Sequence, residues 1–300
     1  MGKTLNQPIR REDWLGLRVW LIGASTGIGA ALAETLASLG ARLVLSARHA
    51  DALQAVAGQC LQRHSESDML IVPLDVCNPE TTQAAAHQIQ QQWGGVDLVI
   101  FNAGTYEATR VDTLSTSAAE KSLRLNLLAP IDATAVILPL LLKNSDQARP
   151  RGFAYVASVA GYRGLPRAMT YGPGKAGLIS FAESLWIDLH GIGLNTWVIN
   201  PGFVRTRLTA QNSFDMPALI EPEEAAQSIV RGFASGGFEI HFPKRFTRFM
   251  KLLRLLPINW YLRLVQRLVP PLNREEVLRA RTTDKENEMN VSHLPGGKKL

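Results

Sequence analysis

Residues 17–29 read Leu-Arg-Val-Trp-Leu-Ile-Gly-Ala-Ser-Thr-Gly-Ile-Gly, an apolar run followed by three closely spaced glycines. The apolar run has the composition of a buried strand, and a helical pattern begins within the glycine segment. The glycines, Gly23, Gly27 and Gly29, permit a tight turn whose backbone N–H groups point at an anion in front of the helix. The stretch therefore predicts a strand–turn–helix unit that cradles a phosphate. The alternative is a glycine turn without a ligand.

The same alternation of short apolar runs and longer helical patterns continues along the chain. Expected strands are Leu17–Ile22, Arg42–Ser46, Met69–Leu74, Asp97–Phe101, Phe153–Ala157, Asn195–Ile199 and Phe238–Phe242. Expected helices occupy residues 27–39, 50–63, 80–92, 117–142, 170–190 and 222–234. Because most strands are apolar throughout, helices must cover both faces of the sheet. The pattern predicts an α/β fold with a doubly wound parallel sheet (Rossmann-type) of about seven strands.

The charge is unevenly distributed. Residues 1–243 carry a net charge of −2, whereas residues 244–281 carry +8. The basicity therefore belongs to one C-terminal segment and not to the α/β body. We divide the chain into an N-terminal extension (1–14), the α/β domain (15–243), two basic amphipathic helices (244–280) and a disordered tail (281–300).

The basic segment allows two interpretations. Phe246–Leu272 mixes large apolar side chains with Arg and Lys, and Pro257 divides it into two short helices. The helices can lie on an anionic membrane surface, with apolar side chains inserted and basic ones at the lipid phosphates. Alternatively, they form a cap on the body or on another subunit. We expect no nucleic-acid binding, because no recognition motif accompanies the charge.

The remaining sequence favours an intracellular setting. Residues 1–14 lack the apolar core of a signal peptide, and Leu125–Leu142 contains Asn126, Asp132 and two prolines, which predicts a buried helix rather than a membrane span. Cys60 and Cys77 provide no disulfide framework. We expect a cytoplasmic protein, peripheral on the cytoplasmic membrane face if the basic helices bind lipid.

Tyr171 and Lys175 stand one helical turn apart in the run Tyr-Gly-Pro-Gly-Lys, and Ser158 follows an expected strand. A free tyrosine titrates near pH ~10, too high for efficient proton transfer at neutrality. An ammonium one turn away favours the phenolate, and a serine hydroxyl can hold a substrate oxygen. Asn126 either anchors a water that relays protons to Lys175 or bonds a neighbouring backbone carbonyl.

Arg48 suggests how a dinucleotide would be selected. The second expected strand ends Leu45-Ser46-Ala47-Arg48, with no acid before Asp51. An acid at this place binds a ribose 2′-hydroxyl, whereas an arginine can fork onto a 2′-phosphate. The sequence therefore predicts NADP(H) over NAD(H). The alternative is that Arg48 is a solvated surface residue.

These motifs together resemble the short-chain dehydrogenase/reductase family, in its compact single-domain branch, over residues 15–243. They are Gly23-Ala24-Ser25-Thr26-Gly27-Ile28-Gly29, Asp75-Val76, Asn102-Ala103-Gly104, Asn126, Ser158, Tyr171 with Lys175, and Asn200-Pro201-Gly202 followed by Thr206. The resemblance implies a catalytic tetrad of Asn126, Ser158, Tyr171 and Lys175. Departures from the usual pattern are Ile22, Phe101 and the residues Gly172-Pro173-Gly174 inside the tyrosine motif, none of which removes a reacting group.

The resemblance also implies the cofactor contacts. Asp75 and Val76 would flank adenine, the segment Asn102–Gly104 would line the cofactor, and Lys175 would bind the nicotinamide ribose. The glycine-turn residues Ser25, Thr26 and Ile28 would line the phosphates. The nicotinamide carboxamide would be held by Pro201, Gly202, Val204 and Thr206.

The predicted function is an NADP(H)-dependent oxidoreductase acting on a small hydrophobic carbonyl or alcohol, with Tyr171 as general acid/base. NAD-linked alcohol oxidation and a non-catalytic, cofactor-binding or membrane-associated protein remain alternatives. A substrate pocket or a packed lid is expected from Phe203, Leu208, Phe214, Met216, Leu219 and Ile220. By resemblance, the helices over 117–142 and 170–190 would build a homo-oligomer.

Overall fold

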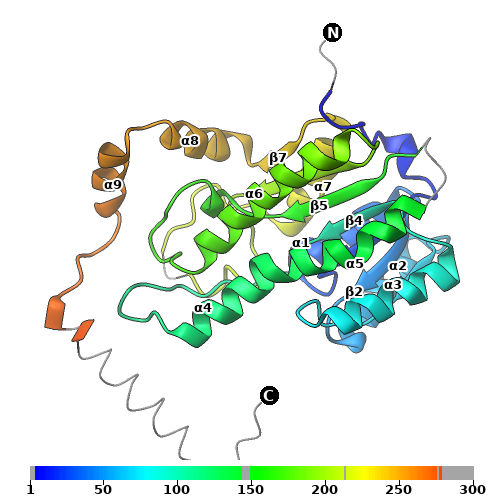
Figure 1. The fold of residues 1–300 in the computed structure, drawn as a ribbon, viewed down its shortest axis with the longest axis horizontal. Helices are drawn as coiled ribbons and strands as arrows, with labels where there is room; N and C mark the ends of the chain where they lie inside the picture. Colours follow the sequence, from blue (N-terminus) through cyan, green and yellow to red (C-terminus); the bar gives the residue numbers. More distant parts are fainter. Residues whose placement is uncertain (1–3, 144–148, 213, 276, 279–300) are drawn as a thin grey trace, which may run out of the picture.

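A parallel seven-stranded sheet forms the centre of the computed structural model, which describes residues 4–143, 149–212, 214–275 and 277–278 (Figure 1). The strands are β1 (Arg18–Ile22), β2 (Arg42–Ser46), β3 (Met69–Ile71), β4 (Leu98–Phe101), β5 (Gly152–Val156), β6 (Asn195–Pro201) and β7 (Glu239–Phe242). Their order is β3-β2-β1-β4-β5-β6-β7. The chain reverses its direction of winding between β1 and β4, and ligands bind beyond such a point in open α/β sheets. The predicted fold class is confirmed.

Helices cover both faces of the sheet. One face carries α1 (Gly27–Ser38), α2 (Ala50–Arg63) and α7 (Pro222–Ala234), and the other carries α3 (Pro79–Trp93), α5 (Ala129–Lys143) and α6 (Tyr171–His190). Alternate residues of β1 enter the two cores, since Val19 and Leu21 pack on the first face while Trp20 and Ile22 pack on the second. This alternation explains why the strand is apolar throughout.

The single helix expected over residues 117–142 is interrupted. It consists of α4 (Thr116–Leu123), a π-helical turn η2 (Arg124–Leu128) and α5. The turn packs on α6 at Gly177, where an added Cβ would lie 2.9 Å from Leu127 Cδ2. Among the described residues, Thr116–Lys143 is long and apolar enough to cross a membrane by length and composition, with 44% of its apolar window buried. Its inner side packs on the sheet, as expected of a core helix.

Most boundaries lie within two residues of expectation, and the largest difference is at β3. Strand β3 ends at Ile71 and not at Leu74, because Pro73 has no N–H to donate to the sheet. The N-terminal segment is joined to the body, since Trp14 is fully buried and the Asn6 side chain donates to the Thr196 carbonyl at 2.7 Å. After β7 follow α8 (Lys244–Arg254) and α9 (Ile258–Gln266). The predicted tail 281–300 lies outside the described residues.

Candidate active site

The turn between β1 and α1 is packed so closely that its glycines are required. Gly23 has φ +91°, and an added Cβ would lie 2.5 Å from the backbone nitrogen of Ala103. An added Cβ on Gly29 would lie 2.0 Å from the carbonyl oxygen of Gly23. The backbone N–H groups of Gly23 and Ala24 donate to the Ser46 carbonyl, at 2.7 and 3.1 Å. The turn is therefore fixed between the ends of β2 and β4.

The N-terminus of α1 fits an anionic ligand. The helix has 12 residues, its first turn carries no acidic side chain, and the side chain of its N-cap, Thr26, makes no capping bond. The backbone N–H groups of such a first turn have no partner within the helix, and the helix dipole is positive there. Ser25 and Ile28 are half-buried at this turn. Both the glycine cradle and the free helix end are what a pyrophosphate needs.

The loops after β2 and β3 meet at one edge of this cradle. The Leu74 N–H donates to the Ala47 carbonyl at 3.0 Å. Arg48 is exposed, and its charge reaches the Cys77 thiol, whose pKa is raised mainly by burial. Asp75 is exposed and accepts from the Cys77 N–H at 3.0 Å, whereas Val76 is buried. The structure thus brings Arg48, Asp75 and Val76 together.

The segment after β4 links the cradle to the predicted tetrad. The Asn102 side chain donates to the Gly23 carbonyl at 2.8 Å. An added Cβ on Gly104 would lie 3.1 Å from Asn126 Oδ1 and 3.4 Å from Lys175 Nζ. The predicted cofactor residues and the predicted catalytic residues therefore share one site at the carboxyl end of β4.

Asn126 lies in the π-helical turn and is fully buried. Its Nδ2 donates to the Thr105 carbonyl at 2.8 Å, and its Oδ1 accepts from the Thr105 N–H at 3.3 Å. Two roles are expected for this side chain, a water-mediated proton relay and a bond to a neighbouring backbone carbonyl. The hydrogen bonds to Thr105 are those of the second role. The bond holds residues 104–105 in place, and the proton relay remains a prediction.

A glycine in the tyrosine motif allows the π-helical turn to approach the start of α6. An added Cβ on Gly174 would lie 3.2 Å from Asn126 Cβ. Farther along the same helix, Gly177 accommodates Leu127 in the same way. The departure Gly172-Pro173-Gly174 thus has a packing role, since Gly174 permits Asn126 to lie against the start of α6. Tyr171 is the first residue of that helix, one position after the expected start at residue 170.

Tyr171, Ser158 and Lys175 converge, but their electrostatics differ from expectation. Burial raises the pKa of Tyr171 to about 12, and a hydrogen bond with Ser158 opposes this shift. Lys175 donates to the Val156 carbonyl at 2.9 Å, and burial lowers its pKa to about 8. The expected lowering of the pKa of Tyr171 by Lys175 is therefore wrong. Desolvation of the phenolate outweighs the distant ammonium.

Sequence reasoning missed Tyr106, which lies against the catalytic candidate. Its ring meets the Tyr171 ring edge-to-face, with centroids 5.1 Å apart and planes at 77°. Burial raises its pKa, so it also stays neutral at physiological pH. An aromatic residue two positions after Asn102-Ala103-Gly104, at the carboxyl end of a central strand, was the signal available in the sequence.

The segment after β6 brings the remaining candidates to the cradle. Pro201 ends β6, and the Gly202 N–H donates to the Phe242 carbonyl at 2.7 Å. Val204 forms an isolated bridge with Ile220. An added Cβ on Gly27 would lie 3.0 Å from Thr206 Cγ2, so this segment lies directly against the phosphate turn.

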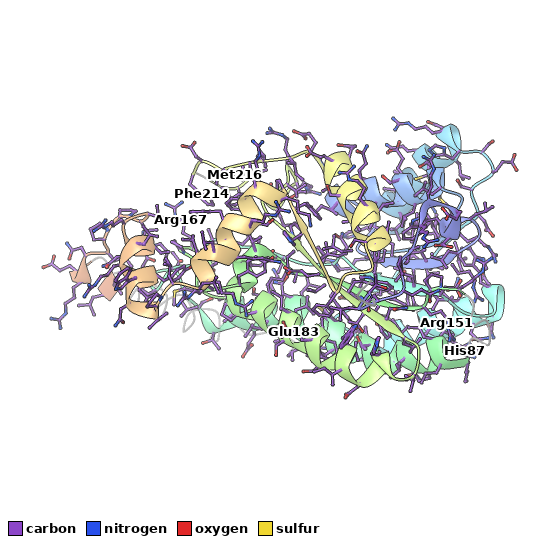
Figure 2. All side chains as sticks on the ribbon, turned by 90° about the horizontal axis from the view of Figure 1, so that it is seen from above. His87, Arg151, Arg167, Glu183, Phe214 and Met216 are labelled. Carbon is purple, nitrogen blue, oxygen red and sulfur yellow. The ribbon has the colours of Figure 1, made fainter. Side chains whose placement is uncertain are left out.

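The expected substrate side is lined in part by aromatic residues. Phe203 packs on Phe214 and on Phe246 of α8, with centroids 5.9 and 5.7 Å apart. Figure 2 shows Arg167, Phe214 and Met216 together at the end of the molecule beside α8. The Arg167 guanidinium lies over the Phe214 ring at 5.6 Å.

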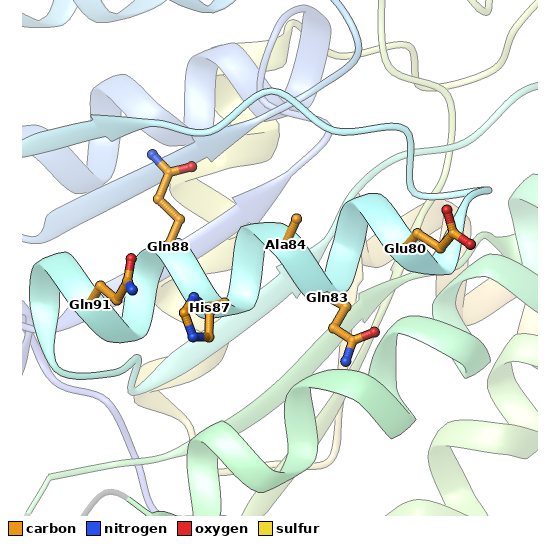
Figure 3. Close-up of a pocket in the computed structure, with 6 residues that line it drawn as sticks. All are labelled: Glu80, Gln83, Ala84, His87, Gln88 and Gln91. Carbon is orange, nitrogen blue, oxygen red and sulfur yellow. The ribbon is translucent and has the colours of Figure 1, made fainter.

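A separate hollow, on the outer side of α3, contains none of the predicted site residues (Figure 3). It is lined by Glu80, Gln83, Ala84, His87, Gln88 and Gln91. Because all six come from one helix, the hollow is a shallow polar surface and brings no separate elements together.

A profile of the family described as short chain dehydrogenase matches residues 18–216, more than half of the chain. The chain belongs to the short-chain dehydrogenase family. An uncharacterized oxidoreductase of Myxococcus xanthus is 33% identical over 236 residues, which are 78% of this chain and 90% of that protein. The chain is an oxidoreductase of the short-chain dehydrogenase family.

Solved structures share the fold. A short chain dehydrogenase/reductase from Burkholderia phymatum in complex with NAD superposes with a TM-score of 0.72 at 22% identity, covering 87% of this chain and 99% of that one. L-Sorbose reductase from Gluconobacter frateurii, complexed with NADPH and L-sorbose, superposes with a TM-score of 0.66 at 24% identity, covering 77% and 96%.

Proposed function

We propose that this short-chain dehydrogenase reduces, and in reverse oxidises, a small hydrophobic carbonyl or alcohol with NADP(H). The bound nicotinamide would supply or accept the hydride. The observation that carries the proposal is the convergence of Ser158, Tyr171 and Lys175 beside Gly104, next to a glycine turn that fits a pyrophosphate. A protein that only binds a dinucleotide has no need of a phenol and a buried ammonium at this place.

In reduction, Tyr171 donates its proton to the oxygen that receives negative charge. Burial keeps the phenol protonated at neutral pH, which is the form a proton donor requires. Ser158 orients the substrate oxygen, and the nearby cation of Lys175 offsets the charge left on the phenolate. Oxidation is the reverse step, in which the phenolate of Tyr171 takes the proton of the alcohol.

Arg48 supports NADP(H) as the cofactor. It is exposed at the end of β2, beside the loop of Asp75 and Val76, where a 2′-phosphate would lie. The two solved neighbours hold NADPH in one case and NAD in the other, so the fold accepts either. NAD-linked alcohol oxidation is the alternative within the same chemistry.

An apolar substrate is supported by the side chains around the tyrosine. Tyr106 covers one side of Tyr171, and Phe203 and Phe214 form an aromatic pair in the segment after β6. Apolar and aromatic walls with a few polar groups are typical of small-molecule sites.

We also infer a homo-oligomer built through the outer sides of α5 and α6. Leu128 at the end of η2, Leu142 near the end of α5 and Ile187 of α6 are exposed by 45%, 50% and 70%. Burial of such side chains between copies would stabilise the assembly. Sedimentation velocity of the purified chain, compared with Ile187→Ser, tests this point, and a monomeric wild-type chain would contradict it.

Turnover tests the main proposal. NADPH and NADH consumption is followed with a panel of apolar ketones and aldehydes, and Tyr171→Phe is compared with Tyr106→Phe. We expect NADPH-selective turnover that falls by a factor of about 10²–10⁴ in Tyr171→Phe and changes little in Tyr106→Phe. If NADPH binds but neither cofactor is consumed by any substrate class, the non-catalytic alternative holds.

A further inference from the structure

Helix α8 is fixed to the body by one of its sides. Met250 is buried in the core on the α6 side of the sheet, and the fully buried hydroxyl of Thr247 is hydrogen-bonded to Nδ1 of His241 in β7 at 2.6 Å. Lys251 forms an ion pair with Glu239 of β7. The opposite side of α8 is therefore held outward in a defined orientation.

Helix α9 is anchored in the same way but by fewer contacts. Tyr261 is 1% exposed, and its hydroxyl donates to the Gly164 carbonyl at 2.6 Å. Beyond the helix, Arg110 donates to the Pro270 carbonyl at 2.9 Å. Figure 1 shows α8 and α9 at one end of the molecule, with α9 projecting away from the helices that cover the sheet.

The exposed side of these two helices carries large apolar side chains. Six large side chains from consecutive turns are 53–79% exposed, namely Phe249, Leu252, Leu255, Ile258, Trp260 and Leu262. Single exposed apolar residues are normal on protein surfaces, but six within residues 249–262 indicate a binding surface.

The same surface is strongly basic. Residues 244–272 contain seven Lys or Arg and no Asp or Glu. Six of the cations are exposed, namely Lys244, Arg245, Arg248, Arg254, Arg263 and Arg267. We call the six apolar and six basic side chains together the C-terminal face.

We infer that the C-terminal face binds an anionic phospholipid bilayer. Lipid headgroups match the cations, and the acyl region matches the apolar side chains that lie between them along the chain. A second copy of this chain fits poorly, because a two-fold interface would bring identical basic surfaces together. A nucleic acid would use the cations but would leave the aliphatic side chains in water.

The C-terminal face is connected to the active site. Arg163 donates to the Leu253 and Leu256 carbonyls, at 3.1 and 2.8 Å, and its guanidinium lies 4.3 Å from the Tyr261 ring centroid. Arg163 belongs to the loop that follows Ser158 by way of the short helix η3 (Val159–Gly161). Bilayer contact would place this loop near the membrane, where an apolar substrate partitions. This last step rests on the proposed function, whereas membrane binding does not.

Vesicle sedimentation of the full chain tests the inference. We expect wild type to sediment with vesicles of equal parts phosphatidylcholine and phosphatidylglycerol but not with phosphatidylcholine alone. Arg245→Gln/Arg248→Gln/Arg263→Gln should weaken the association about a hundredfold, since each cation near an anionic surface contributes about fivefold. The matched control is Leu15→Ser/Ile192→Ser, which removes exposed apolar side chains elsewhere and should bind as wild type. Wild type that remains in the supernatant with both vesicles would overturn the inference.

Trp260 provides a second readout that does not depend on turnover. We expect brominated phosphatidylglycerol to quench tryptophan emission in wild type and to quench less in Trp260→Phe, which should still sediment. Equal quenching in both would contradict insertion of α9. If Phe249→Ser/Leu252→Ser lowers the mass in sedimentation velocity without changing vesicle binding, the C-terminal face is instead an interface between copies.

Discussion

The ammonium of Lys175 donates a 2.9 Å hydrogen bond to the main-chain carbonyl of Val156, the last residue of β5. It lies 5.7 Å from the ring centroid of Tyr171, one turn earlier in α6. The lysine is therefore held by the sheet and not by the phenol. The two groups have pKa values shifted in opposite directions by the same cause, because burial disfavours whichever form is charged.

Lys175→Met should change the pH dependence of stability. The folded chain holds this lysine at a pKa of about 8, below its usual 10.5, so the unfolded chain binds more protons between these pH values. The free energy of unfolding of wild type should thus rise relative to the variant, by about 3 kcal/mol between pH 8 and 10.5. The cost of leaving the Val156 carbonyl without its donor does not depend on pH.

Urea denaturation of both proteins between pH 7 and 10 measures the difference. The same substitution at Lys121, an exposed lysine of α4, supplies the background slope. A difference between wild type and Lys175→Met that stays constant with pH would show that the lysine is not destabilised by burial.

Arg48→Glu should lower the affinity for NADPH by a factor of about 10–100, because a charge-assisted hydrogen bond to a phosphate contributes about 1.5–3 kcal/mol. Affinity for NADH should stay the same or increase, since a carboxylate can accept from the ribose 2′-hydroxyl. Isothermal titration with both cofactors measures this, and Arg231→Glu on α7 is the matched exposed control. Equal losses for NADPH and NADH would mean that Arg48 does not read the 2′-phosphate.

Gly29→Ala should destabilise the fold by about 2 kcal/mol or more, because the new methyl group meets the Gly23 carbonyl and forces α1 away from the turn. Gly58→Ala is the matched control. This glycine lies within α2 with no atom within 4 Å of an added Cβ, so alanine there should stabilise by about 0.5–1 kcal/mol. Chemical denaturation separates the two, and NADPH binding by folded Gly29→Ala should also be weak. Similar stability of both variants would refute the close packing at the turn.

The elements that sequence predicted well depend on local chemistry. The turn at Gly23 follows from the backbone freedom of glycine, and the strands follow from their apolar pattern. The start of α6 at Tyr171 follows from the placement of proline in the first turn. All three depend on residues that are neighbours in the sequence. They also predict a doubly wound parallel sheet, whose crossovers have a preferred hand, but not the order of its strands.

The elements that sequence missed depend on distant contacts. The π-helical turn around Asn126 forms against Gly174 and Gly177 of α6, which no pattern within residues 117–142 reveals. The partner of Lys175 is a backbone carbonyl of a different element, and the pKa of Tyr171 follows from burial. Spacing alone placed the phenol and the ammonium together, but it does not reveal the burial that disfavours the charged form of each.

Arg163→Met should release α9 from the loop beside the active site. The arginine donates from one nitrogen to three carbonyls at the end of α8, those of Leu253, Arg254 and Leu256, and covers the Tyr261 ring. Methionine keeps the apolar stem but loses these bonds, so we expect about 2 kcal/mol of destabilisation and faster proteolysis of the C-terminal segment.

Tyr261→Phe shows whether the effect is specific to Arg163 or follows from any weakening of the contact between α9 and the loop. It keeps the ring under the guanidinium and loses only the bond to the Gly164 carbonyl, so its effect on proteolysis should be smaller. Both side chains join α9 to the same loop. The increase in cleavage rate in the double variant should therefore be smaller than the sum of the increases in the two single variants. Limited proteolysis with mass spectrometry measures the cleavage rate. Unchanged cleavage in Arg163→Met would mean that the bond from Tyr261 to the Gly164 carbonyl, and not Arg163, holds α9 to this loop.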